Sequence, residues 1–180
     1  MEMHRLSVEQ FREADKLPLV VVLDDIRSAY NVGSMFRTAD AFRLEALWLC
    51  GITACPPSAE IHKTALGAED SVAWKRFGSA EDAVGELHRR GYFVYSIEQV
   101  EGSTKLQDLL LPPHAVPTPP EGYALVLGNE VKGVRQTVVD MSDACLEIPQ
   151  RGTKHSLNVS SAAAIVMWEF ARQLVFGAAK

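Results

Sequence analysis

Apolar and polar positions along the chain form blocks that predict strands and helices in turn. Short, continuous apolar runs such as "LPLVVVLDDI" predict strands that are buried on both faces. Segments with apolar residues three and four positions apart predict helices. The expected strands cover residues 17–26, 45–50, 71–77, 92–98, 123–128 and 144–149. The expected helices cover residues 31–42, 58–66, 79–90, 130–142 and about 159–175.

Strands that alternate with helices indicate an α/β fold, in which a mostly parallel sheet carries helices on both faces. We expect one domain over residues 1–180, with residues 1–18 as an N-terminal extension. The only Pro-rich stretch, residues 111–122, is expected to be a surface connection because helix cannot run through it. Sites in such sheets lie outside the carboxyl ends of the strands.

Composition narrows the class of protein. The chain has 180 residues, is 47% hydrophobic and carries a net charge of −5, so nucleic-acid binding would need a local basic cluster. Its three cysteines show no CxxC spacing and no signal core precedes them, which favours reduced thiols and a cytoplasmic location. The histidines show no metal-ligand spacing. We expect no apolar run as long as a membrane span.

The segment "NVGSMFRTADAF" follows the first strand. Asn31 could cap the helix that we expect to begin at Val32. Arg37 and Asp40 lie on the side opposite the apolar stripe, where they could form a weak surface pair. Alternatively, Arg37 points over the strand ends, where a fixed cation could bind a phosphate or polarise a hydroxyl.

The segment "LVLGNEVKGV" ends another buried strand. Gly128 would let backbone approach a ligand closely. Glu130 is expected in the first turn of the next helix, either as a simple dipole partner or as a functional acid. The loop is neither GxGxxG nor a Walker loop, which argues against an ordinary dinucleotide enzyme.

The segment "GTKHSLNVSSAAAIVMWEF" places Ser156 and Asn158 before the last helix. Either residue could cap that helix, and both could belong to a site. Ile165 and Trp168 lie off the main apolar face, so we expect the first half of the helix to be buried nearly all round. A helix of small residues could also pack against a second copy of itself.

Together, these three segments resemble the three motifs of the SpoU/TrmH family, which are S-adenosylmethionine-dependent RNA ribose 2′-O-methyltransferases of the SPOUT class. The resemblance covers about residues 19–176. It implies a deep trefoil knot in the C-terminal part of the sheet and a homodimer that binds the methyl donor at the knot. It also implies tRNA or rRNA as substrate, with no metal and no membrane association. No separate RNA-binding domain is recognisable.

The resemblance also assigns roles to residues. The implied catalytic set is Asn31, Arg37, Glu130, Ser156 and Asn158. The implied donor contacts are Glu98, Leu127, Gly128, Asn129, Ile148, Pro149, Ser156 and Leu157. Arg37 would come from the partner subunit and activate the 2′-hydroxyl, either as a base or as a fixed charge. The basic residues available for phosphates are Lys63, Lys75, Arg76, Lys132, Arg135, Arg151 and Lys154.

Other classes of protein remain as alternatives. A non-catalytic RNA-binding or assembly factor could retain the fold, although the intact polar set speaks against it. A methyltransferase acting on a base or a small molecule is a third hypothesis, and the Asn31 and Arg37 pair favours ribose. A flavodoxin-like nucleotide-binding protein is a fourth.

Overall fold

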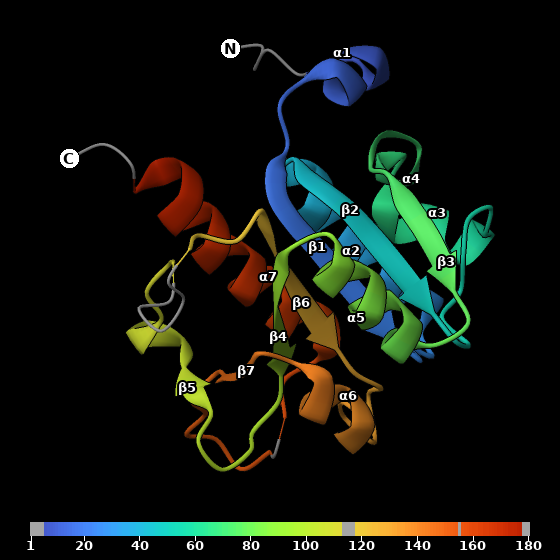
Figure 1. The fold of residues 1–180 in the computed structure, drawn as a ribbon. Helices are drawn as coiled ribbons and strands as arrows, with labels where there is room; N and C mark the ends of the chain where they lie inside the picture. Colours follow the sequence, from blue (N-terminus) through green and yellow to red (C-terminus); the bar gives the residue numbers. More distant parts are fainter. Residues whose placement is uncertain (1–5, 113–117, 155, 178–180) are drawn as a thin grey trace.

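The computed structural model describes residues 6–112, 118–154 and 156–177, in which seven strands form one sheet (Figure 1). The strand order is β3-β2-β1-β6-β4-β7-β5, and every pairing is parallel. The strands are β1 (Leu17–Asp24), β2 (Leu44–Cys50), β3 (Trp74–Phe77), β4 (Tyr92–Ile97), β5 (Thr104–Lys105), β6 (Gly122–Leu127) and β7 (Ala144–Glu147). The predicted parallel α/β sheet is confirmed.

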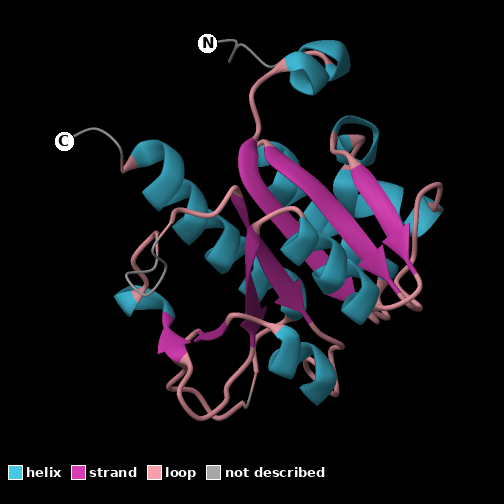
Figure 2. Ribbon diagram, viewed as in Figure 1, coloured by secondary structure: helices cyan, strands magenta, loops and turns pink. Residues whose placement is uncertain are grey.

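Helices cover both faces of this sheet (Figure 2). They are α1 (Val8–Glu13), α2 (Ala29–Ala41), α3 (Ala59–Ala65), α4 (Ala68–Ser71), α5 (Ala80–Arg89), α6 (Gln136–Met141) and α7 (Val159–Ala171). A short 3-10 turn follows β5 at Leu106–Asp108, and a π-helical turn, Arg172–Phe176, extends α7. The predicted strands and helices therefore alternate as expected, with several shifted boundaries.

Two apolar cores lie on opposite faces because successive side chains of a strand point to opposite sides. In β1, Leu19, Val21 and Leu23 pack in the larger core with α2, α3 and α7. Val20 and Val22 pack in the smaller core with α5 and α6. All six residues of β6 are buried, which explains why this strand is apolar at every position.

Some predicted boundaries are wrong. The helix expected over residues 130–142 exists only at Gln136–Met141, because residues 129–133 form a turn in which Asn129 pairs with Gly133. The strand expected over residues 71–77 begins only at Trp74, after the short helix α4. The short elements α1 and β5 are absent from the prediction. A capping box between Ser7 and Gln10 begins α1.

The last helix also differs from its prediction. Val166, Met167 and Phe170 are buried, but Ile165 is 40% exposed and Trp168 is 47% exposed. The expectation that its first half is buried nearly all round is therefore wrong for the single chain. With its π-helical turn, the helix spans 18 residues of mean hydropathy 1.2, which is long and apolar enough to cross a membrane. The expected lack of such a run is also wrong, although one side of this helix packs on α2 and the sheet.

The central part of the Pro-rich stretch, residues 113–117, lies outside the described residues, as do His4 and His155.

Candidate active site

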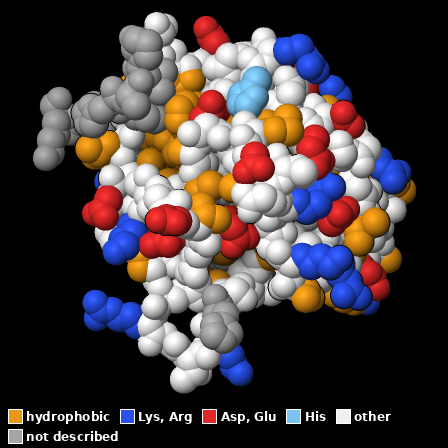
Figure 3. Space-filling view, turned by 60° about the horizontal axis from the view of Figure 1, so that its bottom comes forward, with side chains coloured by type: hydrophobic (Ala, Val, Ile, Leu, Met, Phe, Trp, Pro, Cys, Tyr) orange, Lys and Arg blue, Asp and Glu red, His pale blue; other side chains and the backbone are white. Residues whose placement is uncertain are grey.

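A cavity of about 330 Å³ opens at the carboxyl ends of β4, β6 and β7, against the first turn of α7. This is the place where ligands bind in parallel α/β sheets. Figure 3 brings this end of the molecule forward and shows acidic and basic side chains interspersed on it. The cavity is lined by Ile97, Glu98, Gln99, Leu127, Gly128, Asn129, Glu130, Val131, Lys132, Gly133, Leu146, Glu147, Ile148, Gln150, Ser156, Leu157, Val159 and Ala162.

Seven of the eight predicted donor contacts line this cavity. They are Glu98, Leu127, Gly128, Asn129, Ile148, Ser156 and Leu157, and only Pro149 is not part of the lining. The prediction missed other wall residues, including Val131, Gly133 and Ala162. The sequence could have indicated them, because Val131 and Gly133 follow the end of β6 and Ala162 lies in the first turn of α7.

Position 128 is glycine for a structural reason that the sequence did not reveal. A Cβ atom at this position would lie 2.2 Å from the carbonyl carbon of Gly133 and 2.3 Å from the backbone nitrogen of Val134. The missing side chain therefore makes room for the chain's own loop, and the approach of a ligand to Gly128 stays a prediction. Gly133 has φ +69°, a left-handed conformation that glycine adopts without strain.

Side chains fix this loop as one wall of the cavity. The Asn129 side-chain oxygen accepts hydrogen bonds from the backbone of Val131 and Lys132, at 3.0 and 3.1 Å. Its amide donates to the Asp25 carbonyl at 2.8 Å. The Glu98 carboxylate accepts from the backbone N–H of Val134 at 2.8 Å. Asn129 and Glu98, both predicted donor contacts, thus also hold the wall in place.

An ion pair between an exposed arginine and a buried carboxylate fastens the far end of the same loop. Arg135 donates two hydrogen bonds, of 2.9 and 3.1 Å, to the carboxylate of Asp24, which is 1% exposed. Burial raises the pKa of Asp24, and the Arg135 guanidinium opposes that rise. Arg135 also contacts Glu81 of α5 at 3.0 Å. Its charge is therefore engaged within the protein.

Glu130 connects the loop to the start of α2. Its carboxylate accepts hydrogen bonds from the backbone of Arg27 and Ser28, both at 3.0 Å, and from the Asn31 side-chain amide at 3.2 Å. Burial alone would raise the pKa of Glu130, but these donors together hold it below its usual value. The predicted place of Glu130, in the first turn of the next helix, is wrong because that helix begins later.

The hydrogen bonds continue to α7. Asn158 donates from its side-chain amide to the Asn31 side-chain oxygen at 3.2 Å. Its own oxygen accepts from the backbone of Ser160 and Ser161, so Asn158 is the cap of α7, and Ser156 is not. Ser28, rather than Asn31 as predicted, caps α2. Glu130, Asn31 and Asn158 thus join the three sequence motifs in one chain of contacts.

Arg37 is not brought to this cavity within one chain. It lies six residues after Asn31, which places it about 9 Å further along α2 and on a different face of the helix. It lines a separate groove of about 600 Å³, together with residues of α3 and α7. Among the described residues it forms no ion pair with Asp40, so the predicted surface pair is not found.

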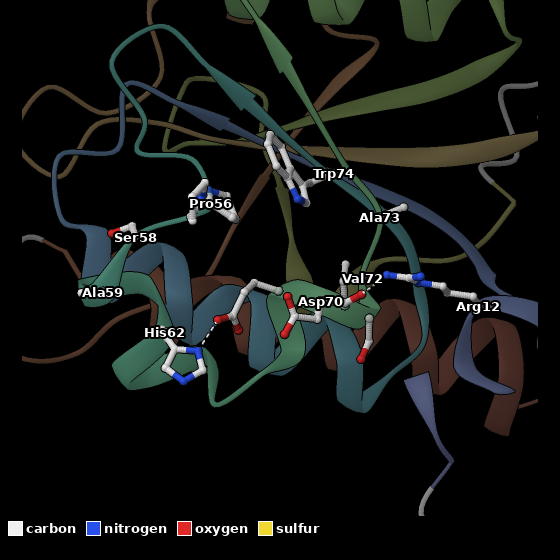
Figure 4. Close-up of a pocket in the computed structure, with 12 residues that line it drawn as sticks. Arg12, Pro56, Ser58, Ala59, His62, Asp70, Val72, Ala73 and Trp74 are labelled. Carbon is white, nitrogen blue, oxygen red and sulfur yellow. Dashed lines mark hydrogen bonds and ion pairs between the residues drawn. The ribbon is translucent and has the colours of Figure 1, made fainter. Parts of the chain in front are cut away.

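A third hollow, of about 850 Å³, lies beside the edge strand β3 (Figure 4). Its polar groups contact one another: Arg12 donates to the carbonyl of Asp70 at 2.7 Å, and His62 pairs with Glu69 at 2.5 Å. It contains none of the predicted catalytic or donor-binding residues. Within the described ranges, no group of three or more His, Cys, Asp or Glu side chains could hold a metal ion.

Comparison with known proteins gives the class to which this fold and site belong. The SpoU rRNA Methylase family matches residues 18–168, and the chain therefore belongs to that family. It is 31% identical over 158 residues to a 23S rRNA (guanosine-2′-O-)-methyltransferase of Neisseria meningitidis, covering 88% of this chain and 60% of the relative. It is 28% identical to an uncharacterized tRNA/rRNA methyltransferase of Borreliella burgdorferi, covering 93% of this chain and 69% of the relative.

Solved structures share the fold. A TrmH/SpoU tRNA modifying enzyme of A. aeolicus superimposes with a TM-score of 0.77 at 24% identity, over 92% of this chain and 81% of that chain. An AdoMet-bound rRNA methyltransferase of Sinorhizobium meliloti gives 0.74 at 26% identity, over 92% of this chain and 60% of that chain. The expected SPOUT fold, a parallel α/β sheet with a C-terminal trefoil knot, is confirmed by this likeness. The chain spans 69% of the length of the Borreliella relative and 60% of that of the Neisseria relative.

Proposed function

We propose that the protein is an S-adenosylmethionine-dependent RNA methyltransferase that transfers a methyl group to a ribose 2′-hydroxyl of tRNA or rRNA. The observation that carries this proposal is the cavity at the strand ends. Residues of the second and third motifs form its walls, and hydrogen bonds of Glu130 and Asn158 connect its rim to Asn31 of the first motif. Family membership supports it, as does the AdoMet bound to the Sinorhizobium relative.

The residues of the cavity fit this donor. Leu127, Ile148, Leu157 and Ala162 offer apolar surface to the adenine ring of the donor. The cavity volume lies in the usual range of about 300–1,000 Å³ for small-molecule sites. The donor supplies an already activated methyl group, so the protein has to position the 2′-hydroxyl and assist loss of its proton.

The polar residues then take distinct roles in the proposal. Asn31, Glu130 and Asn158 form one hydrogen-bonded chain and act as positioning residues for the rim. Ser156 lines the cavity and is exposed, so it can contact the donor or the RNA. A guanidinium is essentially always protonated, so Arg37 serves as a fixed charge that stabilises the developing alkoxide.

We further propose that two copies assemble, because Arg37 faces a groove separate from the cavity. Ile165 and Trp168 are exposed on α7, and Trp168 contacts the rings of Phe42 and Phe176 at 5.8 and 5.7 Å between centroids. Burying this aromatic group against a second chain would remove apolar surface from water. Arg37 of one chain would then serve the cavity of the other.

The proposed setting is the cytoplasm, where the three cysteines, free in the structure, would stay reduced and RNA is the partner. We propose no membrane association, with the apolar face of α7 directed to the second copy instead.

Two measurements test the proposal. The first compares 2′-O-methylnucleosides by mass spectrometry in digests of total tRNA and of rRNA, from wild-type cells and from cells that lack the protein. One missing 2′-O-methylnucleoside would establish the reaction and its substrate class. The second is calorimetry with S-adenosylmethionine. Binding without methylation of any RNA would favour the non-catalytic assembly factor, and absence of binding would contradict the proposal.

A further inference from the structure

The groove that contains Arg37 is a second concave site with a composition of its own. Helix α2 contributes most of its lining and packs against both α3 and α7. Its lining consists of Ser34, Arg37, Thr38, Ala41, Phe42, Lys63, Thr64 and Ala164. Two side chains carry positive charge, three carry hydroxyls, and none carries negative charge.

Both cations of this groove are exposed and uncompensated. In the part of the chain that the structure describes, neither Arg37 nor Lys63 forms an ion pair with a carboxylate. By contrast, the guanidinium groups of Arg89, Arg90, Arg135 and Arg172 all contact a Glu or Asp side chain. In a protein of net charge −5, two uncompensated cations along one groove are complementary to an anionic ligand.

Packing of α3 on α2 determines where Lys63 lies relative to α2. Gly33 lets α3 approach closely, because a Cβ atom there would lie 2.2 Å from the Thr64 hydroxyl and 2.3 Å from the Ile61 carbonyl. The Thr64 hydroxyl donates to the carbonyl of Tyr30 at 2.9 Å. The Lys63 ammonium lies 5.9 Å from the centre of the Tyr30 ring. Lys63 therefore stands beside the first turn of α2, while Arg37 lies about two turns further along the same helix.

The hydroxyl groups limit what the groove can recognise. Ser34, Thr38 and Thr64 each donate to a backbone carbonyl, of Tyr30, Ser34 and Tyr30 respectively. Their protons are therefore already used, and the donors left for an anion are those of Arg37 and Lys63. Such a site reads charge and shape rather than base identity.

We propose that this groove binds the sugar-phosphate backbone of the RNA substrate, and that Lys63 contacts a phosphate close to the ribose served by Arg37. This inference rests on the proposed function. It assigns to the catalytic domain a phosphate contact that positions the substrate. Lys63 acts here as a positioning residue, so its loss weakens RNA binding and leaves the chemical step intact.

The test uses the full chain with Lys63→Gln, and with Lys63→Arg as the variant that keeps the charge. The probes are total tRNA and rRNA from cells that lack the protein, titrated between about 50 and 200 mM salt. Loss of one phosphate contact reduces the magnitude of the slope of log affinity against log salt by about 0.9. Over this range of salt, the ratio of parent affinity to variant affinity then changes by about threefold. We expect that loss in Lys63→Gln, with kcat at saturating RNA and donor affinity unchanged, and its recovery in Lys63→Arg.

Lys105→Gln is the matched control, because Lys105 is an exposed lysine of β5 at the opposite edge of the sheet from β3. It should leave the salt slope unchanged. An unchanged slope and KM in Lys63→Gln, with methylation intact, would refute the inference and leave the proposed function standing. The inference would also be refuted, and the proposed function left standing, if Lys63→Gln abolished binding to an acidic protein but left RNA binding unchanged. If the parent protein methylates no RNA, the proposed function fails first, and RNA titration of Lys63→Gln still decides the inference.

Discussion

Replacing Glu130 by Gln should destabilise the fold through the start of α2. The two carboxylate oxygens accept three hydrogen bonds, from two backbone N–H groups and the Asn31 amide. Glutamine keeps one acceptor oxygen, so at least one donor loses its partner, at a cost of about 1 kcal/mol at this half-exposed position. Loss of the negative charge beside a helix N-terminus adds about 0.3–1 kcal/mol.

The expected loss is therefore about 1.3–2 kcal/mol, which corresponds to a decrease in Tm of about 3–8 °C for a domain of this size. Thermal unfolding at pH 7 without donor measures it, with Glu101→Gln in an exposed turn as control. A change in Tm below about 1 °C would refute the assignment of Glu130 as a stabilising hydrogen-bond acceptor at the start of α2. Because the pKa of Glu130 is lowered on folding, its stabilisation is present above its unfolded pKa of about 4.3 and disappears as pH falls through the folded pKa. The difference between parent and variant should therefore vanish in acid.

Three further substitutions test the roles of Arg37, of the loop that packs on Gly128, and of α7. Arg37→Ala should abolish methyl transfer while donor affinity measured by calorimetry survives; equal loss of both would show that Arg37 shapes the donor cavity. Gly128→Ala should push away the backbone of Gly133 and weaken donor binding by at least tenfold while circular dichroism stays native, since the collision is confined to one loop; normal donor affinity would contradict the role of that loop as a wall. Trp168→Glu should yield monomers in light scattering and lose activity, and mixing it with Arg37→Ala should not restore activity; a dimeric variant would place the interface elsewhere.

Much of the architecture was predictable because its signals are local. The apolar runs of β1 and β6 have no polar position to offer solvent, which predicts strands buried on both sides of a parallel sheet. The loops after these strands, and the one before α7, could then be placed at one end of the sheet. Residues from the last two of these loops do line one cavity there.

Other features depended on contacts between distant segments. The short turn at residues 129–133 interrupts a helical pattern, because Asn129 satisfies the backbone there and Gly128 leaves space for it. Glu130 reaches the start of α2, about a hundred positions earlier, and no local rule connects those residues. The exposure of one side of α7 could not be predicted for the same reason. Periodicity shows that a helix face is apolar, but it does not show which segment covers that face.

The sequence by itself determined the parallel α/β fold, the family and the set of polar residues at the strand ends, because each follows from short patterns along the chain. Only the tertiary structure decided how that set is divided. It joins Glu130, Asn31 and Asn158 at the cavity and turns Arg37 into a different groove beside Lys63. The physical reason is helical geometry: six residues along α2 separate Asn31 from Arg37 by nearly two turns, and the packing of α3 and α7 then determines what each of them faces.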